Sequence, residues 1–185
     1  MQISVFSPLR LVGGTALALQ LGHRHSIDLD FFGTFDFGHW EIQEELTAIG
    51  LEVSSRHSTG RIHIFNVDGV KVDFVNYPYN WLESCVEAEN VRLASMKDIA
   101  AMKLEAVTNR GTRKDFVDVY FLLQHFSLSQ MLDFYKQKYP DGSVFNVLRS
   151  LSYFVDAEND PMPKMIKKTD WEEVKSNVCK TIGHF

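Results

Sequence analysis

Apolar and polar positions along the first 32 residues predict a strand, a helix and a second strand in close succession. The apolar residues 9–12 end at a pair of glycines, and apolar positions then recur at helical spacing over residues 16–21. Residues 26–32 instead alternate polar and apolar before they end in aromatic residues, as a half-buried strand does. A compact strand-helix-strand unit therefore opens the chain.

The following pattern predicts one helix and then a meander of three strands. Residues 40–49 place apolar side chains at helical spacing. Strands are expected at residues 51–57, 61–67 and 70–75. Asp68-Gly69 stands between the last two of these strands and is a strong hairpin signal. We expect this meander to lie beside the opening unit.

From residue 80 onwards the pattern changes to helices. An acidic connector and a short extended segment at residues 91–94 come first, and Ser95 is a good cap for the helix that follows. Helices are predicted at residues 95–111, 112–123, 127–139, 143–151 and 170–182. The order predicts an α+β fold, with a mixed-sheet core over residues 1–90 and a C-terminal helical subdomain over residues 91–185.

Composition narrows the class of protein. The 185 residues are 45% hydrophobic, enough for a packed core, and no apolar run approaches the roughly 18 residues that a membrane helix needs. Cys85 and Cys179 are isolated and the N-terminus has no signal-peptide pattern, so we expect a cytoplasmic protein without disulfides. A net charge of −5 argues against nucleic-acid binding over the whole surface, although residues 91–114 carry six basic and two acidic side chains.

Two motifs in the opening unit are candidates for ligand binding. The first is Gly13-Gly14, because glycines let the backbone approach a ligand and the N–H groups at a helix start favour an anion. A tight turn also needs glycine for steric reasons alone. The second is Asp28 and Asp30, whose i, i+2 spacing puts both carboxylates on one strand face, where a hard divalent cation would relieve their repulsion. The alternative is an ordinary solvated strand face.

The sequence from Gly13 to Leu19, GGTALAL, followed by RHSIDLDF from Arg24 to Phe31, resembles the AbiEii/AbiGii toxin family of nucleotidyltransferase-fold proteins. That family belongs to the polymerase-beta-like nucleotidyltransferase superfamily, whose general pattern is a Gly-Gly or Gly-Ser turn, a helix and then Asp-x-Asp. The Arg-x-Ser before Asp-x-Asp narrows the resemblance to this branch. The resemblance spans roughly residues 9–123 and implies a nucleotidyltransferase fold.

The resemblance also implies a second motif on the later helices. Its matching residues are Lys103 on one helix and Lys114, Asp115 and Asp118 on the next. A lysine can neutralise triphosphate charge, and an aspartate can orient that lysine. The alternative is that the two aspartates cap an amphipathic helix and form surface ion pairs, which contribute little.

A third carboxylate is a further expectation from the superfamily, which often places one on a later strand that faces the Asp-x-Asp pair. Asp73 is the residue in a position to match it. The alternative for Asp73 is an outward-facing strand residue paired with Lys71 or Arg61.

The resemblance therefore implies transfer of a nucleoside monophosphate from an NTP to an acceptor hydroxyl. It assigns Mg²⁺ or Mn²⁺ to Asp28 and Asp30, with Asp73 as the candidate third ligand. Positioning of the nucleotide phosphates is expected of Gly13, Gly14, Thr15, Arg24, Ser26 and Lys103, with Asp115 supporting the lysine. By resemblance to the family's members, the protein is expected to be the toxin of a toxin–antitoxin or phage-defence pair. RNA, in particular tRNA, would be the acceptor, and a cognate antitoxin protein would be the partner.

Two other functions remain open. One is a nucleotidyltransferase that modifies a small molecule such as an antibiotic, and the other is a non-catalytic protein of the same fold that binds a nucleotide or a partner. A transition-metal site is not indicated, because His23, His25, His57 and His63 lack the spacing of a zinc ligand set. We expect these histidines in loops or at the surface.

Overall fold

The structure is a computed structural model and describes residues 3–183. Within them one seven-stranded mixed sheet has the order β3-β4-β5-β2-β1-β7-β6. The strands are β1 Arg10–Val12, β2 Leu29–Gly33, β3 Val53–Ser58, β4 Ile62–Val67, β5 Val70–Asn76, β6 Val86–Ala88 and β7 Val91–Leu93. The α-helices are α1 Gly13–Leu21, α2 His39–Ala48, α3 Met96–Asn109, α4 Arg113–Leu122, α5 Leu128–Lys138, α6 Val144–Leu151 and α7 Trp171–Gly183.

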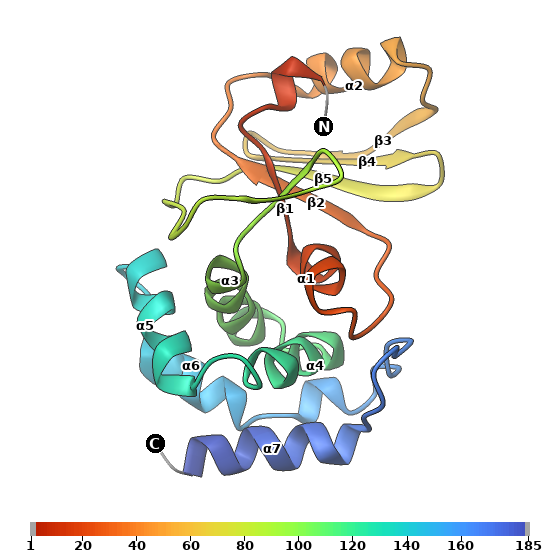
Figure 1. The fold of residues 1–185 in the computed structure, drawn as a ribbon. Helices are drawn as coiled ribbons and strands as arrows, with labels where there is room; N and C mark the ends of the chain where they lie inside the picture. The colour runs from red at the N-terminus through yellow and green to blue at the C-terminus, as the bar shows by residue number, and fades with distance from the viewer. Residues whose placement is uncertain (1–2, 184–185) are drawn as a thin grey trace.

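The helices lie in layers on the two sides of the sheet (Figure 1). Helix α2 covers one face, α1 and α3 lie against the other, and α4 to α7 form a further layer beyond α1 and α3. Two short 3-10 helices, η1 Ser4–Phe6 and η2 Val155–Ala157, complete the regular structure. This is the predicted α+β architecture, with the helical layer built from the second half of the chain.

Strand pairing confirms the opening unit and the meander. Strand β1 runs antiparallel to β2, and β5 returns parallel to β2 after the antiparallel β3-β4-β5 meander. Asp68 and Gly69 connect β4 to β5 with φ of 47° and 83°, the left-handed pair that a tight hairpin turn needs. The register places Asp30 of β2 directly opposite Asp73 of β5.

Two boundaries differ from the sequence pattern. The strand expected over residues 26–32 begins only at Leu29, because residues 22–28 form an irregular turn between α1 and β2. The acidic connector contains β6, which pairs with β7 and is exposed along its length. Its side chains therefore have no buried face, and an exposed strand shows no alternation that a sequence pattern could reveal.

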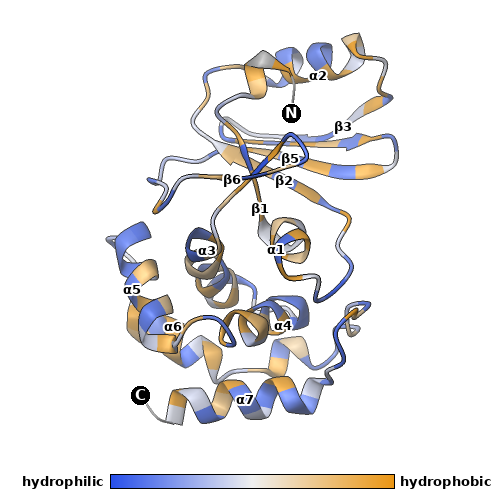
Figure 2. Ribbon diagram, in the orientation of Figure 1, coloured by the Kyte–Doolittle hydropathy of each residue, from blue (hydrophilic) through white to orange (hydrophobic). Residues whose placement is uncertain are grey.

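Two hydrophobic clusters hold the layers together, and apolar residues concentrate between the layers in Figure 2. The larger cluster joins the sheet to α1, α3 and the helices beyond them, and Ile99 and Leu104 place fully buried side chains of α3 at its centre. The smaller cluster lies between the opposite face of the sheet and α2. Ser95 caps α3 as predicted, since its hydroxyl oxygen accepts from the Asp98 N–H at 3.1 Å.

Candidate active site

A cavity of about 480 Å³ lies between the sheet and α3 and brings both sequence motifs together. Its polar wall comes from the β1–α1 turn, from two strands and from α3. The charged and glycine positions on that wall are Gly13, Asp30, Asp73, Lys103, Glu105 and Arg110. Four segments that lie far apart in the sequence therefore meet around one space.

Asp30 and Asp73 form the acidic pair of this cavity. Burial, followed by the neighbouring Asp73 carboxylate, raises the pKa of Asp30 above its ordinary value. One oxygen of Asp73 accepts from Lys71 Nζ at 2.6 Å, whereas its other oxygen is buried without a hydrogen-bond partner. A divalent cation between the two carboxylates would satisfy that oxygen and relieve the repulsion, so these residues fit a hard metal ion.

Asp28 lies apart from this pair. It precedes β2, is half-buried, and is not among the residues that line the cavity. Its backbone carbonyl accepts a hydrogen bond from the Thr15 hydroxyl. Within residues 3–183, no three His, Cys, Asp or Glu side chains are grouped closely enough to hold a metal ion together. The fit is therefore to two protein carboxylates, the number with which Mg²⁺ is commonly held when substrate phosphates and water complete its coordination.

The glycine pair is needed for steric reasons that also serve a ligand. Gly13 has φ of 68°, and a Cβ added there would overlap with Oδ2 of Asp30. A Cβ on Gly14 would overlap with Nη2 of Arg24 and lie 3.4 Å from Ser26 Oγ. The backbone thus lies against a carboxylate on one side and a guanidinium on the other.

The start of α1 is suited to an anion. Its N-cap is Val12, which offers no side-chain hydrogen bond to the first N–H groups of the helix. These donors and the positive end of the helix dipole favour a phosphate, and the Arg24 guanidinium adds a positive charge beside Gly14. Thr15 and Ser26 join the two sides of this turn, with 2.9 Å between their hydroxyl oxygens. The predicted phosphate-binding residues are therefore neighbours around one turn.

Behind the turn, Asp118 of α4 is the centre of a buried ion network. Its carboxylate is fully buried and accepts hydrogen bonds from His23 Nε2 at 2.8 Å and from Arg24 Nε and Nη2 at 2.7 and 2.9 Å. Lys103 Nζ lies 2.6 Å from its Oδ2. Burial acts to raise the pKa of Asp118, but Lys103, Arg24 and His23 outweigh it and hold that pKa far below its usual range.

Asp115 extends the network towards the cavity. It accepts from Lys103 Nζ at 3.0 Å, from Arg110 Nε and Nη2 at 2.8 and 2.9 Å, and from the Thr112 hydroxyl. Burial opposes ionisation here too, yet the Arg110 hydrogen bond and the Lys103 charge hold the pKa of Asp115 well below its usual value. Asp115 is therefore a carboxylate with three neighbouring donors.

Lys103 is the shared cation of the two aspartates. Its side chain is 3% exposed, and its ammonium is bound to both Asp115 and Asp118 while it borders the cavity. Burial acts to lower its pKa, but the charges of Asp118 and Asp115 raise it, so Lys103 stays protonated. The predicted grouping of Lys103 with Asp115 is present, and the ammonium is held by carboxylates.

The sequence pattern did not reveal that His23 belongs to this network, nor that Arg110 reaches it. His23 was expected in a loop or at the surface; it lies in the turn after α1 but is fully buried, with its ring tilted against that of Phe121 at 4.9 Å between centroids. His63 is likewise buried, against the expectation. Arg110, one of the basic residues of the 91–114 stretch, reaches the cavity and Asp115. No spacing signal marked His23, because its burial depends on how α4 packs against the turn.

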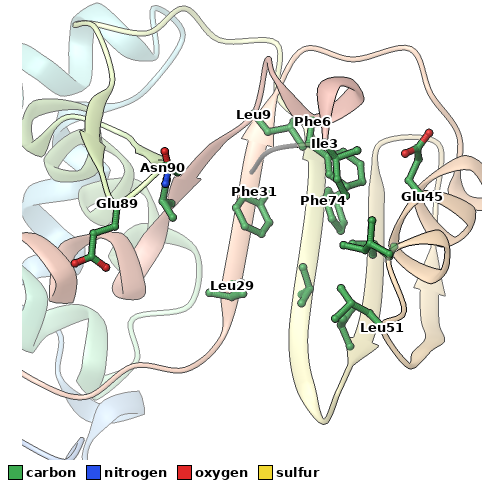
Figure 3. A pocket seen from close by; sticks show the side chains of 15 residues that line it. Ile3, Phe6, Leu9, Leu29, Phe31, Glu45, Leu51, Phe74, Glu89 and Asn90 are labelled. Atoms are coloured by element: carbon green, nitrogen blue, oxygen red, sulfur yellow. The ribbon is translucent and has the colours of Figure 1, made fainter.

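A larger cavity, about 850 Å³, lies elsewhere (Figure 3). It occupies the opposite side of the sheet, where Leu29 and Phe31 point away from the Asp30 face. Only Glu45, Glu89 and Asn90 add polar groups to its apolar wall. It has no grouping of acid, base or metal ligands, so the smaller, charged cavity is the candidate active site.

The chain is similar to proteins that are already known. An uncharacterised protein of Aquifex aeolicus (strain VF5) is 33% identical over 180 residues, which cover 94% of this chain and 85% of that protein. A putative nucleotidyltransferase from H. pylori matches with a TM-score of 0.63 at 22% identity, over 96% of this chain and 85% of its own. MenT4, a nucleotidyltransferase toxin from Mycobacterium tuberculosis H37Rv, matches with a TM-score of 0.55 at 16% identity, over 94% and 74%.

The two solved structures establish the fold, and the sequence match identifies the family. No helix within residues 3–183 is both long and apolar enough to cross a membrane. Residues 2–178 match the family described as "Nucleotidyl transferase AbiEii toxin, Type IV TA system". The glycine turn, the carboxylate opposite it and the Lys103 network thus belong to a nucleotidyltransferase, and the chain is a member of the AbiEii toxin family.

Proposed function

We propose that this nucleotidyltransferase uses an NTP and a divalent metal ion, Mg²⁺ or Mn²⁺, to transfer a nucleoside monophosphate to a hydroxyl of RNA. The observation that carries the proposal is the register of β2 and β5, which sets Asp30 beside Asp73 at the mouth of the glycine turn. A carboxylate pair next to a helix N-terminus offers a cation site and a phosphate site to one nucleotide.

Each group of residues has a defined task in this proposal. Asp30 and Asp73 hold the metal ion, which when bound supplies positive charge to the reacting phosphate oxygens. Gly13, Gly14 and the first N–H groups of α1 hold the outer phosphates, with Arg24 beside them. The acceptor hydroxyl attacks the α-phosphate, so one oxygen–phosphorus bond forms while the bond to pyrophosphate breaks.

The remaining predicted residues support this geometry. Thr15 and Ser26 fix the two sides of the turn, and Asp28, whose side chain does not line the cavity, contributes through its backbone carbonyl. Lys103 is held by Asp115 and Asp118 at the edge of the cavity, where its positive charge favours an anionic transition state.

Membership of a type IV toxin–antitoxin family supports a cognate antitoxin protein as the partner. For the acceptor we propose RNA, including tRNA. NTPs and RNA meet in the cytoplasm, where we expect the protein to act. The fold alone does not choose between RNA and a small-molecule acceptor, so the test includes both.

The test is label transfer by the purified protein. Each α-labelled NTP is incubated with total RNA or with an aminoglycoside, in Mg²⁺, in Mn²⁺ or in excess EDTA. Asp30→Asn is the inactive variant, and Asp36→Asn, at an exposed loop aspartate, is the matched control. We expect label in RNA with metal for the wild type and for the control, and none for Asp30→Asn. Label only in the small molecule, or nucleotide binding without any transfer, would refute the proposal.

A further inference from the structure

The segment between η2 and α7 is bound to the turn that forms the phosphate site. Residues 164–168, which we name the basic segment, run beside residues 23–25 in a short antiparallel bridge between Arg24 and Met165. The His25 N–H donates to the Lys164 carbonyl at 2.8 Å, and the N–H groups of Ile166 and Lys167 donate to the His23 carbonyl at 2.9 and 3.0 Å. Figure 1 shows this segment rising from the helical layer beside the α1–β2 turn.

The basic segment has three exposed lysines, Lys164, Lys167 and Lys168, in five residues. Within residues 3–183 none of them forms an ion pair, and Lys167 Nζ lies 6.0 Å from the centroid of the Phe121 ring. Lys97, by contrast, is paired with Glu83. The charge of the basic segment is therefore available to a ligand.

Three carboxylates beside the segment, Asp160, Asp170 and Glu158, have hydrogen-bond partners other than these lysines. Asp160 accepts from the Arg113 N–H at 3.0 Å, and Asp170 accepts from the Glu173 N–H at the start of α7 at 2.8 Å. Glu158 accepts from Lys175 and from the Trp171 indole. The acidic groups on either side of the segment are thus engaged with the helices that anchor it.

A further cation continues the same surface. Lys114 is exposed on α4, four residues before Asp118, so it lies one turn away on the face that holds His23 and Arg24. Within the described residues it too forms no ion pair. His25, which is exposed, follows the bridged residue Arg24 and precedes Ser26, and its N–H is bound to the basic segment. The cationic surface therefore leads directly to the phosphate-binding turn.

The chemistry of this surface fits a chain of phosphates. Flexible, exposed ammonium groups act as point charges for a phosphate backbone and carry no sequence information. The inner triphosphate site is already supplied by the α1 N-terminus and Arg24, so the outer lysines have no phosphate of a single nucleotide left to contact. We infer that the basic segment and Lys114 bind the sugar-phosphate backbone of the acceptor RNA and lead its reacting end to the transfer site. This inference rests on RNA as the acceptor in the proposed function.

The test compares two double variants with the same change of charge. Lys167→Gln/Lys168→Gln removes charge from the basic segment, and Lys136→Gln/Lys180→Gln removes it from α5 and α7. Binding of a fluorescent single-stranded RNA is titrated by anisotropy at several salt concentrations with the intact chain, and nucleotide KM is measured separately. Circular dichroism melting checks that both variants are folded. Binding needs no catalysis, so it is interpretable even if no label transfer occurs.

We expect the Kd for RNA of Lys167→Gln/Lys168→Gln to rise about 25-fold at 0.1 M salt, since each phosphate contact to single strands contributes about 5-fold there. The slope of log K against log salt should fall by about 0.7 for each lysine. The control pair should leave both values unchanged, and nucleotide KM should be unaffected. An unchanged Kd for RNA in Lys167→Gln/Lys168→Gln, whether or not nucleotide KM rises, would overturn the inference. Absence of transfer to RNA by the wild type would count against the proposed function alone.

Discussion

Replacing Asp118 with asparagine tests whether the buried ion network holds the two motifs together. The carboxylate is fully buried and accepts from His23, twice from Arg24, and from Lys103. Asparagine keeps one acceptor oxygen and turns an amide NH₂ group towards a cation. Arg24 and Lys103 would then be left with one shared acceptor in place of two charged oxygens.

The magnitude follows from the burial of both sides. Removing one partner of a buried ion pair costs about 3–5 kcal/mol, and we expect the upper end because Asp118 pairs with two cations. For a chain of this size a loss of about 5 kcal/mol lowers Tm by about 10–20 °C. The matched control is Asp133→Asn, whose partner Lys136 is 4.0 Å away and equally exposed, and it should shift Tm by no more than about 2 °C.

The assay is thermal and urea unfolding at several pH values. The folded-state pKa of Asp118 is depressed, so its contribution to stability is complete above the ordinary aspartate pKa of about 3.9. Below that pH the unfolded chain takes up a proton that the folded carboxylate refuses, and the contribution is lost. The stability difference between wild type and Asp118→Asn should therefore be largest near pH 7 and shrink towards pH 2. A Tm at pH 7 equal to that of the Asp133→Asn control would refute the reasoning.

Three further predictions concern the cavity. Asp30→Asn should abolish label transfer yet raise Tm at pH 7, because it removes a carboxylate whose pKa is raised by burial and by Asp73. For the same reason the Asp30 carboxyl makes the wild type more stable as pH falls through its raised pKa. Gly13→Ala should lower stability by about 1–2 kcal/mol in urea unfolding and abolish nucleotide binding in calorimetry, whereas Gly60→Ala, where an added Cβ meets nothing, should do neither. Asp73→Asn should weaken Mg²⁺ binding in calorimetry with nucleotide present; an unchanged metal affinity would leave Asp73 as the partner of Lys71 alone.

Most of the fold was predictable from local sequence signals. The Asp68-Gly69 turn was predictable because its two residues tolerate positive φ, and the start of α3 because Ser95 offers a cap. The short strand β6 was not, since an exposed strand has no apolar face. Features that depend on a residue's own conformation can thus be predicted from the sequence, whereas strand pairing at an exposed sheet edge cannot.

The candidate site was predictable in its parts and less so in its connections. Spacing put Asp115 and Asp118 one turn apart on one face of a helix, but spacing does not say what that face meets. The structure turns it inward onto Lys103, which lies on another helix, and onto the turn that bears His23 and Arg24. Burial of a carboxylate follows from tertiary packing, so the sequence pattern could not distinguish a surface ion pair from an ion network around buried carboxylates.

The connection through Asp118 changes how the second motif relates to the first. Arg24 is held by Asp118 and at the same time lies against Gly14, so one carboxylate on α4 fixes the guanidinium at the phosphate turn. Lys103 is bound to that carboxylate as well, which ties α3 to the same point. A displacement of α4 would therefore move Arg24 and Lys103 together. The helices that follow the sheet act on the nucleotide site by setting the position of its cations, and this explains why a lysine and two aspartates accompany a glycine turn from which they are separated by some 80 residues or more in the sequence.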